Sequence, residues 1–423
     1  MSIEHHDSSA PHRRGSSGGR HGRFMWAVIG VLAVLAAALG AATQTQGPRL
    51  EAIDVNTAAV TERAGQTLTI QANQPVNPDD AAVPEVSVVP EVTVDSVVVD
   101  GSAIVITFAE PLDYATTYTV TATAEGRHTG RAAELRAAFT TLDPEVATLV
   151  RGAESDRVAA QRLQDGDAHD QLAVAERIQE YALLDDQTVV VTLDDADRPA
   201  VESVPRSGGD PVPMIDSGIA SVRDLRVEPR TRLAGFIVDD LDQSETFKVL
   251  TYTDSLLLYD MNSPGTLLAT VVDEQNRPLE IAEWRFVPGT TAVLARTLEG
   301  ELVAYDPALG SAATPATEAD WDAAEDAASG PALDLTTTGD VVTVRDESGE
   351  RELFRPAAES SRVGAVCAAP NDEVVAIEVF SGDGEPDGYP VPGFTGATVS
   401  YVRVADGAVI RSANGLQPDW CRQ

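Results

Sequence analysis

The side chains of this 423-residue sequence that are best suited to chemistry are carboxylates, because it has 67 acidic residues and only six histidines. One acidic segment has regular spacing. In "SGDGEPDGYPVPGFTG", residues 381–396, the acids Asp383, Glu385 and Asp387 alternate with other residues and are followed by a glycine. This order is typical of the start of a calcium-binding loop. The bidentate glutamate that such a loop needs at its twelfth position is replaced by Phe394, so we interpret the segment as a flexible acidic hairpin.

Motifs for nucleophilic, metal-dependent or phosphoryl-transfer catalysis are missing from the sequence, which has no G-x-S-x-G, H-E-x-x-H or P-loop pattern. Beyond the first fifty residues the only histidines are His128 and His169, and neither stands near a nucleophile or metal partner. The single lysine, Lys248, lies in a strand-like run. We therefore predict no catalytic residues, no metal ligands and no cofactor.

Composition restricts the class of protein and of partner. The formal net charge of −37 opposes binding to nucleic acid and to anionic lipid, and favours cationic partners. An apolar fraction of 43% is sufficient for packed cores, and the length indicates two or three domains.

The N-terminal region differs from the rest of the chain. Residues 1–23 are rich in Ser, Gly, His and Arg, so we predict a disordered cytoplasmic tail. The run "FMWAVIGVLAVLAAALGAA" follows and has nineteen residues without a charge. At about 1.5 Å per residue a helix of this run would be roughly 28 Å long, close to the thickness of a bilayer core. We therefore predict a transmembrane helix over residues 24–43 that leaves the bulk of a single-pass cell-membrane protein outside the cell. A cleaved signal peptide is the alternative.

Residues 47–142 have the pattern of short antiparallel strands. Apolar and polar residues alternate in "TLTIQA", "SAIVITFAEPL" and "TYTVTATAE", with Pro, Asp and Gly clusters between them. Such strands at intervals of about ten residues predict a β-sandwich. The segments "QANQPVN", "EPLDYATTYTVTA" and the closing Phe-Thr-Thr at Phe139 resemble the bacterial Ig-like domains of SbsA type that occur in cell-surface proteins. The resemblance implies a spacer.

Residues 145–423 contain weak repeats of about 40 to 50 residues, a period typical of propeller blades. The fragments "EYALLDDQTVVVTL", "RDLRVEPRTRLAGFI", "EWRFVPGTTAVLAR" and "AVCAAPNDEVVAIEV" each have an apolar strand, a turn and a second apolar strand. They resemble the blades of TolB-like and WD40-like β-propellers. The resemblance implies an all-β propeller, and counting the repeats, with a first blade that the chain end completes, gives about six blades.

Ring closure would explain a cysteine almost at the end of the chain. The stretch from Val146 to Val174 has outer strands without an inner strand, and the terminal "PDWCRQ" has the inner-strand pattern. We therefore expect the C-terminal strand to complete the first blade. Cys367 and Cys421 would then lie on neighbouring innermost strands and form a disulfide in an oxidising compartment. Two buried thiols are the alternative.

An acidic insertion, "TEADWDAAEDAASG" at residues 317–330, separates two of the repeats and is expected to form one or two helical turns. Its Trp321 could contact a partner or cover the face of a blade, and we favour the second interpretation.

The sequence thus predicts an all-β protein anchored in the cell membrane, in which an Ig-like spacer holds out a propeller. We expect a binding or scaffold function, not catalysis, with a protein, peptide or glycan partner and no nucleic acid. The alternative is a propeller hydrolase or lyase acting on polysaccharide, because carboxylates are abundant and their distances in the fold do not follow from their spacing in sequence.

Overall fold

The structure is a computed structural model. It describes the following parts of the 423-residue chain: residues 24–35, 46–78, 84–165, 169–215, 219–239, 252–329, 333–338, 340–346, 349–382 and 384–422.

The described residues do not show the expected transmembrane helix over residues 24–43, of which residues 36–43 lie outside the described part of the chain. The helix that the structure describes there covers residues 24–35. Within the described ranges, no helix combines the length and the apolar composition that crossing a membrane requires. The prediction of an all-β fold preceded by a transmembrane helix is therefore wrong in its helical part.

The chain divides into two compact units. Unit one consists of residues 1–55, 67–107 and 119–138, and unit two of residues 56–66, 108–118 and 139–423. Two short segments of the first 120 residues therefore belong to the second unit. One of them contains the short helix α2 (Ala59–Glu62).

The strands of the first 140 residues form two antiparallel sheets. The first has the order β1-β2-β5-β4 and the second β3-β6-β7. Their strands are β1 (Leu50–Val55), β2 (Thr67–Ala72), β3 (Glu85–Val89), β4 (Val94–Asp100), β5 (Ala103–Phe108), β6 (Thr117–Glu125) and β7 (Ala132–Thr140). Every second residue of β2, β5, β6 and β7 is buried, as expected for sheets with one face toward a core.

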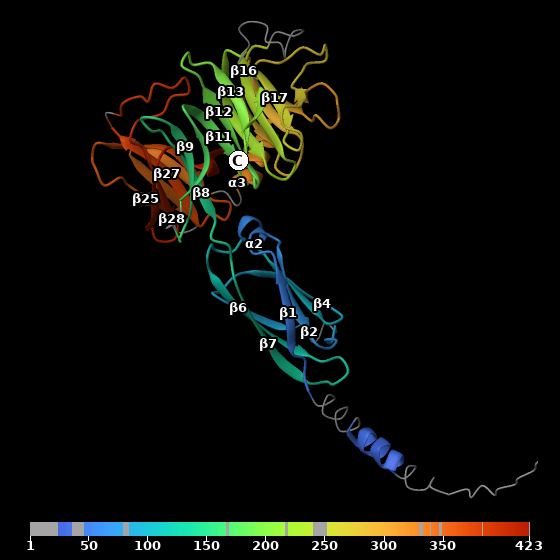
Figure 1. Ribbon diagram of the computed structural model, residues 1–423. Helices are drawn as coiled ribbons and strands as arrows, with labels where there is room; N and C mark the ends of the chain where they lie inside the picture. The colour runs from blue at the N-terminus through green and yellow to red at the C-terminus, as the bar shows by residue number, and fades with distance from the viewer. Residues whose placement is uncertain are drawn as a thin grey trace, which may run out of the picture. The chain divides into compact units, whose positions relative to one another are not determined.

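In its described residues, unit two contains six sheets of consecutive antiparallel strands, which we number as blades one to six. Figure 1 shows strands of several of them. Blades one to three are β8 (Glu145–Val150), β9 (Asp156–Arg162), β10 (His169–Ala175); β11 (Ile178–Leu183), β12 (Gln187–Leu193), β13 (Pro199–Pro205), β14 (Val212–Ile215); and β15 (Ser221–Glu228), β16 (Leu233–Asp239), β17 (Ser255–Asp260), β18 (Leu267–Thr270). Blades four to six are β19 (Ile281–Phe286), β20 (Val293–Thr297), β21 (Leu302–Tyr305), β22 (Thr314–Pro315); β23 (Asp334–Thr338), β24 (Val341–Asp346), β25 (Gly349–Phe354); and β26 (Ser361–Ala368), β27 (Val374–Ser381), β28 (Thr398–Arg403), β29 (Val409–Asn414). This is the arrangement of a β-propeller.

Apolar side chains hold most neighbouring blades together. Separate buried clusters join blades one and two, two and three, three and four, five and six, and six and one. In the last of these, Val146 of β8 packs with Val374 and Tyr401 of blade six. Each cluster uses the continuous apolar runs of central strands such as β12, β16 and β27, which are buried on both faces.

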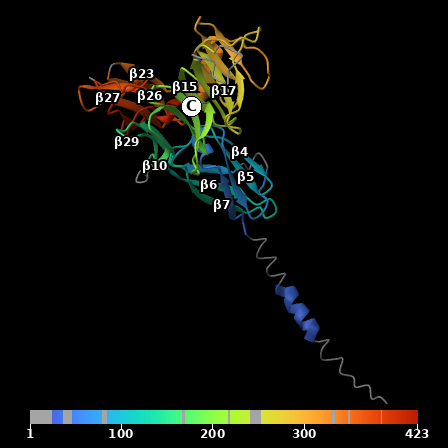
Figure 2. The ribbon, with the colours of Figure 1, turned by 45° about the horizontal axis from the view of Figure 1, so that its top comes forward.

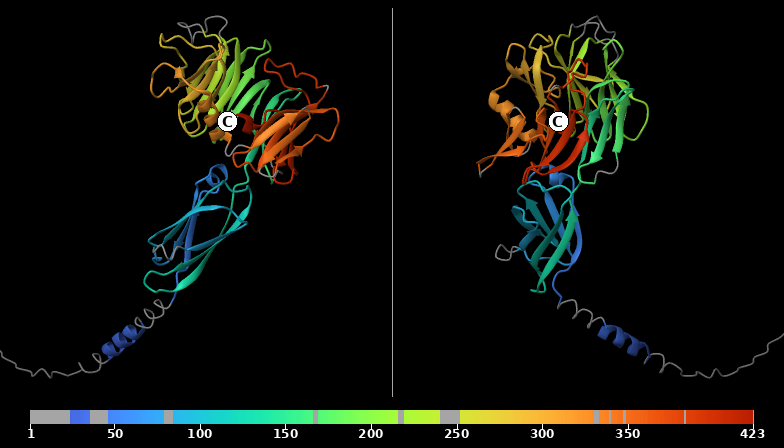
Figure 3. Two further views of the ribbon diagram at one scale, coloured as in Figure 1. Left: turned by 180° about the vertical axis from the view of Figure 1, so that it is seen from behind. Right: turned by 90° about the vertical axis from the view of Figure 1, so that its left-hand side faces the viewer.

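The helix α3 (Glu318–Ser329) covers the remaining face of blade four (Figure 3). Its Trp321 and Ala324 are buried against Leu294 of β20. The guanidinium carbon of Arg285 lies 4.0 Å from the centre of the Trp321 ring. The interpretation of Trp321 as a side chain that covers a blade is confirmed.

Figure 2 shows blade five near the strands of blade six. Blade five has one apolar and one polar face. Val342 and Val344 of β24 pack toward blade six. On the opposite face, the hydroxyls of Thr336 and Thr343 lie 2.7 Å apart, and Arg345 pairs with Asp334 at 3.2 Å. Blades four and five therefore share no apolar cluster in the described part of the chain, because α3 covers one face and the other is polar.

The end of the chain does not form the expected innermost strand. After β29 only Leu416 pairs with β8, in one antiparallel bridge to Leu149. The backbone of Gln417 has a φ of 53°, and Pro418 has no N–H to donate, so a ladder cannot continue. The residues that follow form the 3₁₀ turn η3 (Asp419–Arg422), which contacts β8, β11, β15 and β26.

A covalent bond and ring contacts fix η3 in this place. The structure contains the expected disulfide between Cys367 and Cys421, with Cα atoms 5.4 Å apart. Trp420 stacks on Tyr114 of the same unit at 6.5 Å and meets the Tyr401 ring edge-on at 5.4 Å. The chain end therefore closes blade one through a turn that is anchored by side chains.

Replacement of Trp321 by alanine should destabilise unit two by about 3–5 kcal/mol, because it removes a buried indole from an apolar face. Urea unfolding monitored by circular dichroism would measure this loss. The exposed neighbour Asp322→Ala is the control and should change stability by less than about 0.5 kcal/mol. Equal stabilities of the two variants would contradict the covering role of α3.

Deletion of residues 417–423 should destabilise the propeller more than Cys421→Ser does. The deletion removes the ring contacts, the anchoring hydrogen bonds and the covalent link, whereas the serine variant loses only the link. A disulfide that closes a loop of 54 residues is worth about 4 kcal/mol in the chain-entropy model. Melting temperatures of both variants, with the oxidised and the reduced full chain as references, provide the test. A deleted chain that melts like the full one would show that η3 is dispensable.

Candidate functional site

The acidic hairpin of the last blade reaches across to blades one and two. Residues 384–396 lie between β27, which ends at Ser381, and β28, which begins at Thr398. Backbone bonds close the hairpin, from Asp387 N–H to Gly393 O at 3.0 Å and from Thr395 N–H to Glu385 O at 3.0 Å. The carboxylate of Asp387 forms an ion pair with Arg151, which follows β8. The Asp387 and Arg151 side chains are only 4% and 10% exposed, so the pair is largely shielded from water.

Tyr389 of the same hairpin lies against two arginines. The guanidinium carbon of Arg151 is 3.5 Å from the centre of the Tyr389 ring, and that of Arg177 is 4.7 Å from it. An arginine over the face of an aromatic ring is attracted by the ring quadrupole. The Tyr389 hydroxyl donates a hydrogen bond to Asp156, the first residue of β9.

Backbone groups hold Asp156 in position for this contact. Its carboxylate accepts hydrogen bonds from Gly152 N–H at 3.1 Å and from Ile178 N–H at 2.8 Å. Gly152 directly follows Arg151 in the chain, and Ile178 directly follows Arg177. The two arginines and the carboxylate are thus placed by the turns that end β8 and begin β11.

Gln179 of β11 links the hairpin to the chain end. Its side-chain oxygen accepts from Val391 N–H at 3.4 Å, and its side-chain nitrogen donates to Val222 O at 2.6 Å. Its backbone carbonyl accepts from the guanidinium of Arg151 at 3.2 Å and from the side-chain amide of Gln417 at 3.1 Å. We call Arg151, Asp156, Arg177 and Gln179 the arginine cluster.

The groups of the arginine cluster keep their protonation states at neutral pH, which suits ligand binding better than proton transfer. Burial lowers the pKa of Arg151 to about 10, which leaves the guanidinium charged at neutral pH. Burial and the carboxylate of Asp156 raise the pKa of Tyr389, so that its hydroxyl keeps its proton. The cluster therefore presents two cations and one carboxylate in fixed positions, an arrangement that suits a ligand with an acid and an aromatic hydroxyl.

The chain end contains a buried carboxyl group. Asp419 of η3 accepts a hydrogen bond from Ala147 N–H at 3.1 Å and is 7% exposed. Burial raises its pKa to about 7, although the hydrogen bond from Ala147 and the positive charge of Arg206 act in the opposite direction. The Tyr181 hydroxyl lies 2.8 Å from the carbonyl oxygens of both Ala147 and Gln417. Asp419 thus anchors the last turn to β8, where a strand ladder is not formed.

The structure brings together only some of the residues that the sequence analysis singled out. Cys367 and Cys421 are brought together, and Asp387 of the hairpin is buried in an ion pair instead of lying in solvent. His128 is exposed in a turn of unit one, and His169 begins β10. Asp383 and Lys248 lie outside the described residues. In the ranges that are described, no group of three or more His, Cys, Asp or Glu residues is arranged to hold a metal ion.

Sequence reasoning missed the arginine cluster and Tyr389. The useful signal was a tyrosine next to the prolines of the hairpin, in "DGYPVP". An aromatic side chain does not make an exposed loop more soluble, so its presence indicates a contact. The arginines gave no such signal, since arginine supplies nearly all basic residues of this chain.

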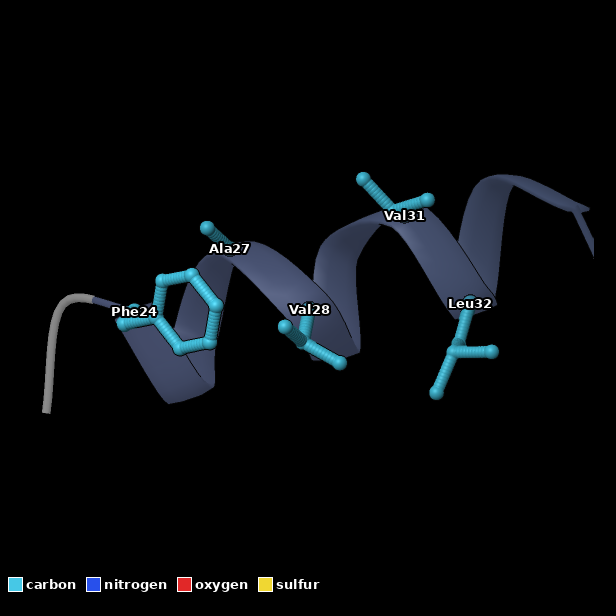
Figure 4. A pocket seen from close by; sticks show the side chains of 5 residues that line it. All are labelled: Phe24, Ala27, Val28, Val31 and Leu32. Atoms are coloured by element: carbon cyan, nitrogen blue, oxygen red, sulfur yellow. The ribbon is translucent and has the colours of Figure 1, made fainter. Parts of the chain in front are cut away.

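A shallow apolar pocket runs along the helix of residues 24–35. Figure 4 shows its lining side chains Phe24, Ala27, Val28, Val31 and Leu32, which all come from that one helix. Its lining contains no polar group that could orient a ligand.

Comparison with known proteins yields structural likeness only. The chain matches no family profile and no curated protein. Among solved structures, TolB from Acinetobacter baumannii is 12% identical over 73% of this chain and 80% of that one, with a TM-score of 0.39. The propeller domain of the Trilobed protease from Pyrococcus furiosus is 8% identical over 85% and 98%, with a TM-score of 0.30. The tricorn protease is 10% identical over 84% and 38%, with a TM-score of 0.34.

Likeness at such low identities and TM-scores carries no argument about function. The expectation of a β-propeller is confirmed, and it rests on the chain's own six sheets. The Ig-like type of the first two sheets stays a prediction.

Stability should fall as the pH rises through about 7. The pKa of Asp419 is raised by folding from its ordinary value, so its contribution is complete below about pH 4 and is lost as the pH passes the folded value. Asp372, whose pKa burial raises to about 7, acts in the same window. Melting temperatures between about pH 5 and pH 8 should therefore decrease for the native chain and decrease less for Asp419→Asn.

The control for this titration is Asp406→Asn, because the pKa of that exposed carboxyl is lowered by hydrogen bonds from Ala408 N–H and Arg403. This variant should keep the native pH dependence above pH 5. A flat native profile would contradict the burial of an ionisable Asp419.

Proposed function

We propose that this chain is an exported, non-catalytic binding protein whose six-bladed propeller recognises a protein or peptide partner. In this proposal the two sheets of the first 140 residues form an Ig-like spacer. Binding depends on the centre of the propeller, where the hairpin, the chain end and the first two blades meet.

The disulfide supports a location outside the cytoplasm. Disulfides persist in oxidising compartments and are rare where glutathione keeps thiols reduced. Both cysteines of the chain are used in this one bond. The net charge of −37 supports high solubility and opposes a nucleic-acid partner.

The observation that carries the proposal is the arginine cluster. Arg151 and Arg177 both lie against an aromatic ring, and Asp156 accepts a hydrogen bond from its hydroxyl. Such fixed donors, acceptors and cation–π platforms are the features by which proteins recognise tyrosine-containing, acidic segments. Here the chain's own hairpin supplies the acid and the ring.

Polysaccharide cleavage, the alternative, needs two carboxyl groups on either side of a sugar. The carboxylates near the centre have structural partners instead. Asp156 accepts backbone hydrogen bonds, Asp387 pairs with Arg151, and Glu378 accepts from Gln417 N–H at 3.0 Å. The binding function is therefore preferred.

Incubation of the oxidised full chain with a panel of neutral and acidic polysaccharides should release no new reducing ends and no unsaturated products. The same preparation should bind members of a displayed peptide library saturably, with enrichment of acidic sequences that contain tyrosine. Turnover of any polysaccharide that disappears in Asp156→Asn would overturn the proposal and make the protein an enzyme.

A further inference from the structure

We propose that the arginine cluster is the binding site for an Asp-x-Tyr segment of a partner protein, and that hairpin 385–395 occupies this site in cis. The inference rests on the proposed binding function, and it names the site and the ligand chemistry. The hairpin sequence "EPDGYPVPGFT" is then a model of the ligand.

The hairpin is suited to be displaced as a unit. Its strand-like contacts are internal, including the bridge between Pro386 and Phe394. None of residues 384–396 contributes a buried apolar side chain to the core. Most of its residues are exposed, namely Glu385, Pro386, Gly388, Pro390, Pro392, Thr395 and Gly396. Apart from the stacking of Phe394 on Phe380, it is held on the propeller by the polar contacts of Asp387, Tyr389 and a few backbone groups.

These polar contacts define the chemistry of the ligand. A carboxylate pairs with Arg151, and a phenol ring two residues further along lies against both guanidinium groups. The phenol hydroxyl reaches Asp156, and Arg177 donates to Gly388 O at 3.5 Å. A partner segment with Asp-x-Tyr can make each of these contacts, whereas a segment with Asp-x-Phe loses the hydrogen bond to Asp156.

The hairpin does not satisfy the site completely. Arg151 Nε and Gln417 Oε1 are buried and have no hydrogen-bond partner in the described residues. Other nitrogens of the same two side chains, Arg151 Nη2 and Gln417 Nε2, both donate to the carbonyl of Gln179. A segment that offers one more acceptor to Arg151, or a donor to Gln417, would therefore bind more tightly than the hairpin does.

Because the hairpin occupies the site in cis, a partner segment must displace it in order to bind in trans. A tethered segment acts at a high effective concentration, so a free peptide with the same contacts competes poorly. The site becomes available when the hairpin loses its side chains or is lifted by a steric change. Gly393 allows the second route, because an added Cβ there would meet Asp387 Oδ2 and would lie 3.0 Å from Leu416 Cδ1 and 3.1 Å from Arg151 Nη1.

The test uses the oxidised full chain and a fluorescent synthetic peptide with the sequence of residues 385–395. The native chain should bind this probe weakly. The double variant Asp387→Ala/Tyr389→Ala, and separately Gly393→Ala, should bind it at least ten-fold more tightly. Adding Arg151→Ala to either variant should remove this gain. The peptide with Phe in place of Tyr should bind these variants several-fold more weakly than the parent peptide.

Glu385→Gln is the matched control, because it changes an exposed acid of the hairpin that does not contact the cluster. It should bind the probe as weakly as the native chain does. Circular dichroism and melting temperature establish that each variant is folded.

Equal binding by the native chain and the folded variants, or no binding by any of them, would overturn the assignment. Loss of folding in both the double variant and Gly393→Ala would overturn it too, because the hairpin would then be part of the core. Peptides from the displayed library that bind independently of Arg151 would contradict this site but leave the binding function in place.

Discussion

Blade one has three strands of its own, and the free edge of β8 must be covered by the other end of the chain. This constraint determines much of the propeller. An open inner edge would expose N–H and C=O groups and the apolar cluster that joins blades six and one. The cover is a single bridge at Leu416, the carboxyl of Asp419 on Ala147 N–H, and a disulfide to β26. Side-chain contacts thus cover most of the β8 edge, where backbone hydrogen bonds of a further strand would otherwise be expected.

The same closure organises the polar centre. Gln417, held by Glu378, donates to the carbonyl of Gln179, which also accepts from Arg151. Arg151 in turn binds the hairpin through Asp387 and Tyr389. The chain end, the last blade and the first two blades therefore meet in one hydrogen-bonded network, to which the hairpin adds no buried apolar side chain.

The helix α3 makes the ring irregular on its other side. It covers blade four with Trp321, and blade five turns a polar face with Thr336, Thr343 and Arg345 away from blade six. An apolar face and a polar face cannot form a common core. Blades four and five therefore share no apolar cluster in the described residues, whereas the other neighbouring blades do. Ion pairs of Arg296 with Glu283 and Glu318 at the rim add little by themselves, because they are exposed.

The sequence by itself determined the strands, the repeat of about 40 to 50 residues and the lack of catalytic motifs, because these depend on local alternation and residue type. It also determined that two cysteines could pair. Only the tertiary structure decided that the last residues form a turn, although Pro418 is a local reason for it. The arginine cluster could not be predicted, since Tyr389 and Asp156 are 233 residues apart in sequence. Ring closure brings them together, and a periodic pattern in the sequence does not predict such a contact.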